Sequence, residues 1–258
     1  MNTPLILTLN QLREAPYSAV LCYPKLDDVE IENRIKELAC HNVDAVEFSG
    51  QTKTYGLPAP ILGKGFVGLV VVAYLNKQKI ALKIRRMDSD RENLLHEANM
   101  LQKANTVGVG PKYVASSKNF LLMQLIDGDL LPQWLKTHKE KTLMQQVLCE
   151  ILESCYRLDE LGLDHGELSK APKHVIVDCQ NKPYLIDFET ASENRKTANL
   201  PAMCHFLFNS WGETGQLISQ VFGKPDSDKV VALMRQYKKS RTRKIFEQLL
   251  ETCFDVKK

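Results

Sequence analysis

The chain lacks the cysteine pattern of a disulfide-bonded or zinc-binding protein. Its seven cysteines are odd in number and widely spread over 258 residues, and no two of them form a C-x-x-C pair. Disulfide frameworks belong to oxidising compartments, whereas scattered thiols persist inside cells. We therefore expect reduced cysteines in an intracellular protein, and those in helical patterns are expected to act as small buried hydrophobes.

Long hydrophobic runs are also absent. The longest apolar run, Phe66–Leu75, is interrupted by Gly68 and is far below the roughly 20 residues that cross a bilayer. The first residues, MNTPLILTLNQLREAP, carry no basic region ahead of their short apolar run, which argues against a signal peptide. We predict a cytoplasmic protein without a membrane partner.

Neither sign of charge dominates the composition. The formal net charge is +3 and the pI is near 8.4, with 25% charged and 44% hydrophobic residues. These proportions are typical of a folded globular protein, and the chain is less basic than a domain that binds nucleic acid through charge. Neither repeats nor low-complexity tracts are visible, so we expect one domain with an extension or two small domains.

Residues 1–56 have the pattern of an extension with its own elements. Two short apolar runs, Leu5–Thr8 and Ala19–Cys22, are predicted as strands, and an amphipathic helix is predicted to begin near Asp27. The segment AVEFSG resembles a further strand, and the Gly/Pro stretch GLPAP is typical of a linker to the next region.

The remaining chain divides into a strand-rich part and a helix-rich part. Residues 57–126 alternate strand patterns with one helical segment, DSDRENLLHEANMLQKA, predicted to start at its Asp-Ser-Asp cluster. Residues 127–258 are mainly helical and end in RQYKKSRTRKIFEQLLETCF, predicted as a helix. The expected fold is α+β and two-lobed, with a β-rich N-terminal lobe, a short α-helical C-terminal lobe and the small α/β extension.

A glycine loop lies between two predicted strands. Gly63, Gly65, Gly68 and Val70 match the pattern G-x-G-x-x-G-x-V. A dinucleotide fingerprint would open a helix, whereas here a valine-rich strand follows. Between two strands, glycines let backbone amides approach the phosphates of a nucleotide. We predict that this loop binds nucleotide phosphates.

Lys83 lies in the apolar strand KIALKIRRM, where a charge is costly unless it is paired. The predicted partner is Glu97 in the following helical segment, and Glu92 is the alternative. Either residue alone is more simply an ordinary surface group. Their occurrence after the glycine loop favours a nucleotide site.

Two later segments complete a family pattern. HGEL at residues 165–168 and LIDFE at residues 185–189 resemble motifs of the protein kinase superfamily, in particular its compact atypical members such as the RIO and KEOPS-associated kinases. The resemblance covers roughly residues 58–258. It implies ATP as a cofactor, with Mg²⁺ or Mn²⁺.

The resemblance also implies roles for individual residues. Gln124 and Leu125 would form the hinge beside adenine, and Glu167 would be the catalytic carboxylate that orients the acceptor hydroxyl. Lys83 would orient the α and β phosphates. Asp187 ends an apolar strand, and a hard carboxylate there suits a divalent ion bound to phosphate.

Two residues depart from the family pattern. Glu167 replaces the usual aspartate, and its extra methylene moves the carboxylate by roughly 1.5 Å, a displacement large enough to slow a positioned reaction. His174 falls where asparagine usually binds the second metal ion. Imidazole suits Mn²⁺ better than Mg²⁺, so we predict higher activity in Mn²⁺. A structural, hydrogen-bonded histidine is the alternative.

The segment after Asp187 has no A-P-E motif, which leaves the substrate surface undefined. Thr190, Ser192 and Thr197 are candidate phosphoacceptors. A basic run at residues 238–244 could contact RNA or a ribonucleoprotein, although most such runs are solvated helix faces.

The leading prediction is an ATP-dependent serine/threonine kinase of compact atypical type that acts on an unknown protein, including itself as a candidate. A nucleotide-binding pseudokinase that regulates a partner is the alternative suggested by Glu167 and His174. A small-molecule kinase is the alternative suggested by Glu189 in place of the usual glycine.

Overall fold

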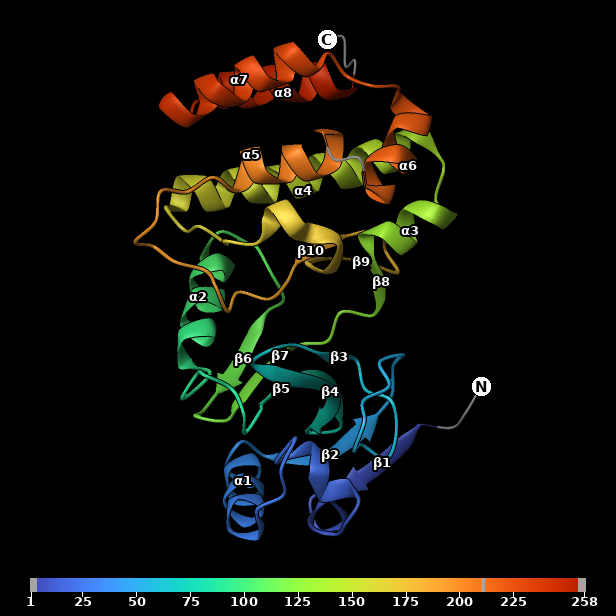
Figure 1. Cartoon of the computed structure of the whole chain (residues 1–258), viewed down its shortest axis with the longest axis vertical. Helices are drawn as coiled ribbons and strands as arrows, with labels where there is room; N and C mark the ends of the chain where they lie inside the picture. Colours follow the sequence, from blue (N-terminus) through green and yellow to red (C-terminus); the bar gives the residue numbers. More distant parts are fainter. Residues whose placement is uncertain (1–3, 210–211, 255–258) are drawn as a thin grey trace. The chain divides into compact units, whose positions relative to one another are not determined.

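The computed structural model describes residues 4–209 and 212–254, with side chains except at positions 170, 171 and 209 (Figure 1). The chain forms two compact units. The first, called the sheet unit, comprises Met1–Asn99 and Lys112–Leu125, and the second, called the helical unit, comprises Met100–Pro111 and Ile126–Lys258.

The sheet unit is built on a seven-stranded antiparallel sheet in the order β1-β2-β4-β5-β7-β6, with β3 paired to β4. Its strands are β1 (Leu5–Thr8), β2 (Val43–Phe48), β3 (Gly63–Lys64), β4 (Gly68–Leu75), β5 (Gln78–Arg85), β6 (Tyr113–Ser116) and β7 (Phe120–Gln124). Its helices are η1 (Gln11–Arg13), η2 (Tyr17–Val20), α1 (Asp28–Cys40) and the first residues of α2 (Leu95–Thr106).

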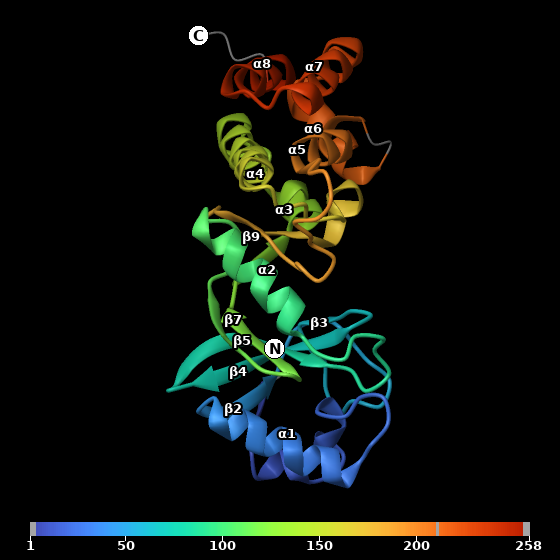
Figure 2. The same cartoon turned by 90° about the vertical axis from the view of Figure 1, so that its left-hand side faces the viewer.

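The N-terminal residues belong to this same sheet. Strand β2 pairs with β4, and the apolar face of α1 joins the buried core of the strands through Ile35 and Leu38. Figure 2 shows α1 beside β2. Asp27 caps α1 by accepting a hydrogen bond from the Glu30 amide, which is the favoured chemistry at a helix start.

Two predicted elements of this unit differ from the structure. Ala19–Cys22 is not a strand, because Tyr17–Val20 forms a 3-10 turn in which the Leu21 amide donates to the Ser18 carbonyl. A short buried apolar run fits either conformation. Helix α2 begins at Leu95 and not at the Asp-Ser-Asp cluster, since Asp88 is engaged by Arg86 and it is Asn93 that accepts from the Leu95 amide.

The helical unit combines a three-stranded sheet with helices. The strands, in the order β10-β9-β8, are β8 (Gly128–Leu130), β9 (Val175–Asp178) and β10 (Pro183–Leu185). The helices are α3 (Leu131–Thr137), α4 (Lys141–Leu161), η3 (Leu168–Lys173), α5 (Asn199–Cys204), η4 (His205–Asn209), α6 (Glu213–Phe222), α7 (Ser227–Lys239) and α8 (Arg243–Phe254). The buried apolar face of α4 forms the centre of this unit, and α5 lies against it.

The C-terminal segment predicted as one helix is two. Helix α7 ends at Lys239 and α8 starts at Arg243, with an extended Ser240 between them. Arg241 explains the break, because its guanidinium donates to the carbonyls of Asp159 and Thr197. Hydrogen bonds to these buried carbonyls stabilise a turn that helix periodicity alone does not indicate.

The predicted α+β class is confirmed by these elements. In the described part of the chain, every helix is too short or too polar to serve as a bilayer-crossing segment.

Candidate active site

The glycine loop joins β3 to β4 in the sheet unit. Gly63 pairs with Val70, and the Gly65 amide donates to the Gly68 carbonyl at 2.8 Å, which closes the loop. A Cβ on Gly68 would lie 2.9 Å from the Ile84 carbonyl oxygen and 3.0 Å from Lys83 Cγ. Only glycine therefore allows this strand to pass so close to Lys83.

Lys83 and Glu97 form a buried ion pair within the sheet unit. Lys83 Nζ lies 2.8 Å from Glu97 Oε2 and 2.9 Å from Oε1. The residues are only 4% and 5% exposed, so the pair is shielded from water and salt. Glu92 is exposed in the loop before α2. The predicted Lys83–Glu97 pairing is present in the structure.

The predicted hinge residues stand at the end of β7. The Gln124 amide donates to the Lys112 carbonyl, and the Gln124 side-chain oxygen accepts from the Lys112 amide. Gln124 is thus fixed to the chain segment before β6. Because the backbone N–H of Gln124 already donates to Lys112, we expect the contact with adenine to come from Leu125.

In the helical unit, His165 organises the loop that carries Glu167. Its amide donates to Asn199 Oδ1 at 2.8 Å, and its ring Nε2 donates to the Ile186 carbonyl at 3.1 Å. Burial, together with the nearby His174, lowers the pKa of this imidazole to about 4. His165 is therefore neutral near pH 7. Its hydrogen bond links the loop that carries Glu167 to Ile186, the residue before Asp187.

Asp187 has an unusual backbone conformation. It follows Ile186, which is the first residue after β10, and its backbone φ is 69°. Positive φ is uncommon for residues other than glycine, and such strain collects at functional sites where surrounding contacts enforce it. Phe188, 2% exposed, anchors the next position, its ring 4.9 Å from that of His165.

Glu167, His174 and Asp187 come together in the helical unit. Their ligand atoms lie within 4.8 Å of one another, and His174 Nε2 is 3.3 Å from Glu167 Oε2. Each side chain keeps some exposure. The sequence prediction named all three residues, but it did not anticipate that the histidine and the glutamate would contact each other.

The donor set fits a divalent cation. The Asp187 carboxylate and the His174 imidazole combine hard oxygen with borderline nitrogen, a combination that suits Mn²⁺ better than Mg²⁺. Nε2 is the ring atom of His174 that faces Glu167, and within the described residues the buried Nδ1 has no hydrogen-bond partner.

A buried network behind this site was missed by sequence reasoning. Asp159 on α4 accepts from the amides of Asn199 and Leu200, from Asn199 Nδ2 and from the Tyr237 hydroxyl. Asn199 in turn holds the His165 amide. The only signal in the sequence is an acidic residue beside the apolar face of α4. That position alone does not distinguish a buried anchor from a surface residue.

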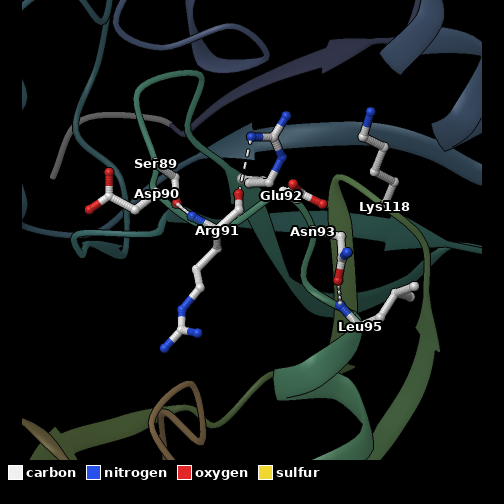
Figure 3. A pocket seen from close by; sticks show the side chains of 8 residues that line it. Ser89, Asp90, Arg91, Glu92, Asn93, Leu95 and Lys118 are labelled. Atoms are coloured by element: carbon white, nitrogen blue, oxygen red, sulfur yellow. Dashed lines mark hydrogen bonds between the residues drawn. The ribbon is translucent and has the colours of Figure 1, made fainter.

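One hollow of about 600 Å³ contains, of the residues considered for the site, only Glu92, the alternative partner of Lys83. It belongs to the sheet unit and is lined by Arg85, Lys118 and residues of the loop before α2 (Figure 3). Cations and anions alternate around it, so its charge favours no single class of ligand.

Comparison with known proteins assigns the chain to a family. The RIO domain family matches residues 70–202, a span that includes Lys83, Glu97, Glu167, His174 and Asp187. A protein of Methanocaldococcus jannaschii described as uncharacterized is 33% identical over 87 residues, which are 33% of this chain and 72% of that protein. The chain therefore belongs to the RIO domain family of atypical protein kinases and has a kinase-like fold.

Proposed function

We propose that this protein is an ATP-dependent phosphotransferase that acts on a serine or threonine hydroxyl of another protein. Membership of the RIO family supports the kinase-like activity. The observation that carries the specific proposal is the gathering of Glu167, His174 and Asp187 within 4.8 Å. A carboxylate for the acceptor and two ligands for a metal ion are the groups that phosphoryl transfer needs.

The sheet unit supplies the nucleotide contacts in this proposal. Gly63, Gly65 and Gly68 let the backbone approach the phosphates, with Val70 following on the strand. Lys83 would orient the α and β phosphates, and Glu97 would keep the ammonium in place. Gln124 and Leu125 would lie beside adenine.

The chemical step follows from the residues of the helical unit. The acceptor oxygen forms a bond to the γ-phosphorus while the bond between that phosphorus and the bridging oxygen breaks and ADP leaves. Glu167 orients the hydroxyl and accepts its proton. Asp187 and His174 would hold Mg²⁺ or Mn²⁺, and the ion would supply positive charge to offset the negative charge of the nucleotide phosphates.

The hydroxyls near the site are hydrogen-bonded or buried, which favours an external acceptor. Thr190 Oγ1 donates to the His165 carbonyl at 3.0 Å. Thr197 is 5% exposed. Phosphorylation of either residue would require the loop to open. Ser192 is half-buried and its Oγ accepts from the Asn194 amide.

The test is phosphate transfer from γ-labelled ATP to a panel of unfolded and folded proteins, in Mg²⁺ and in Mn²⁺ separately. Asp187→Ala serves as the control for contaminating kinase. Label that appears on serine or threonine with wild type and disappears with Asp187→Ala supports the proposal. ATP binding without transfer to any protein would contradict it, and a parallel assay with small hydroxyl compounds then separates a small-molecule kinase from a pseudokinase.

A further inference from the structure

The glycine loop is held by one arginine at two of its carbonyls. The backbone amide of Arg86 donates to the Val67 carbonyl at 2.8 Å, and its Nη1 donates to the Gly65 carbonyl at 2.8 Å. Arg86 follows β5 directly, three residues after Lys83. Glycine-rich segments lose the most conformational freedom on ordering, so two bonds from one neighbour restrict this loop strongly.

Arg86 is itself fixed by Asp88. Its Nε and Nη2 donate to the two carboxylate oxygens of Asp88 at 2.8 and 2.6 Å. A bidentate pair of this kind adds directional specificity to its charge attraction. The Arg86 side chain is only 16% exposed. The guanidinium therefore has one orientation, with Nη1 aimed at the loop.

Tyr23 from the N-terminal region secures the same loop from a second direction. Its hydroxyl lies 2.7 Å from Lys64 Nζ, which donates to it, and its carbonyl accepts from the Met87 amide at 2.7 Å. Lys64 Nζ and the Arg86 guanidinium lie 4.6 and 5.4 Å from the centre of the Tyr23 ring, within the range of cation–π attraction. Tyr23 thus contacts both Lys64 and Arg86, the two cationic side chains at the glycine loop.

We propose that Arg86 and Tyr23 are positioning residues that hold the glycine loop in an ordered form before nucleotide arrives, so that the N-terminal region sets the affinity for ATP. The expected effect on the affinity for ATP rests on the proposed function, whereas the contacts themselves are independent of that function. Ordering a flexible backbone carries a cost in conformational entropy. A loop that is already ordered does not incur this cost on binding.

The experiment compares Arg86→Ala and Tyr23→Phe with wild type. Arg91→Ala is the matched control, because its side chain extends away from the other labelled residues in Figure 3 and has no side-chain hydrogen bond among the described residues. Two quantities are measured: hydrogen–deuterium exchange of residues 63–68 without nucleotide, and the Kd for Mg–ATP. The melting temperature checks that each variant stays folded.

We expect faster exchange in the loop and a Kd raised by roughly three- to tenfold in Arg86→Ala, the effect of losing the side-chain hydrogen bond to the Gly65 carbonyl. Tyr23→Phe keeps the ring and should give a smaller change in the same direction. Arg91→Ala should match wild type in both measurements.

The opposing results are equally definite. Wild-type exchange in both variants would overturn the proposal. Faster exchange with an unchanged Kd would overturn the positioning role while leaving the contacts intact. If wild type binds no ATP, the proposed function fails, and exchange of the nucleotide-free loop alone then decides whether Arg86 and Tyr23 order it.

Discussion

The Lys83 ammonium lies against both carboxylate oxygens of Glu97, at 2.8 and 2.9 Å, and the two side chains are 5% and 6% exposed. A buried ion pair adds little to stability by itself because desolvation offsets the attraction, whereas removing one partner is costly. A buried ammonium at this position fits the proposed role of Lys83 in contacting the phosphates of ATP.

The pair makes a prediction about stability and activity together. Glu97→Ala should lower the free energy of unfolding by about 3–5 kcal/mol, measured by urea denaturation. The double variant Lys83→Met with Glu97→Leu should recover most of this loss, since apolar side chains of similar volume replace the charges. Both variants should lose phosphate transfer. A double variant no more stable than Glu97→Ala would contradict this account.

Glu167 provides a second prediction. Glu167→Ala should reduce phosphate transfer by at least about a hundredfold, in the range typical of a lost general base, with little change in the Kd for ATP. Glu167→Asp restores the family's usual residue but withdraws the carboxylate by roughly 1.5 Å. Because the loop is fixed around glutamate by the His165 contacts, we expect Glu167→Asp to be slower than wild type as well.

The matching control is Glu167→Gln, which keeps the shape and hydrogen-bonding reach of the side chain but removes its basicity. It should resemble Glu167→Ala in transfer. If Glu167→Gln retains wild-type turnover, Glu167 does not accept the proton.

His174 determines the expected metal preference. The ligand atoms of His174 and Asp187 lie within 4.8 Å of each other, and an oxygen–nitrogen donor set favours Mn²⁺ over Mg²⁺. Transfer rates measured at saturating metal should be higher in Mn²⁺ for wild type. His174→Asn replaces nitrogen with an amide oxygen and should reverse or remove the preference. Equal wild-type rates in the two metals would exclude the imidazole as a ligand.

Sequence reasoning predicted the local features of this molecule well and the distant ones poorly. The glycine loop, the Lys83 strand and the amphipathic α1 are each determined by a short pattern of residues. The contacts of Arg86 and Tyr23 join segments separated by about sixty residues of chain, and periodicity carries no information about such pairs. Asp159 is buried in a helix whose pattern leaves an acidic residue equally suited to the surface.

The Asp159 network predicts a structural effect separate from catalysis. The Tyr237 hydroxyl donates to Asp159 Oδ2 at 3.2 Å inside the helical unit. Tyr237→Phe should therefore lower the free energy of unfolding by about 1.5–3 kcal/mol, the range for a hydrogen bond to a charged group. Asp159→Asn should cost more, because its amide would face donors at Asn199, Leu200 and Tyr237. Urea midpoints measure both. If Asp159→Asn leaves the free energy of unfolding unchanged, position 159 does not need a side chain with two accepting oxygens.

The basic run at residues 238–244 predicts how RNA binding would have to occur. Arg241 donates to two backbone carbonyls, and Arg243 pairs with Glu153 and Glu247, so both arginines already have protein partners. Among the described residues, the exposed lysines 238, 239 and 244 have no ion-pair partner.

If this surface contacts RNA, replacing the three lysines with glutamine should weaken binding and reduce the slope of log K against log salt by up to about two units, since each phosphate contact on a single strand contributes roughly 0.7. Arg243→Gln should leave that slope nearly unchanged. It should instead lower the free energy of unfolding, because the Arg243 side chain forms an ion pair with Glu153. The measurement is a binding titration of transfer RNA at several salt concentrations. Absence of binding in wild type even at low salt, where phosphate contacts are strongest, would show that this basic run is a solvated helix surface and has no part in recognition.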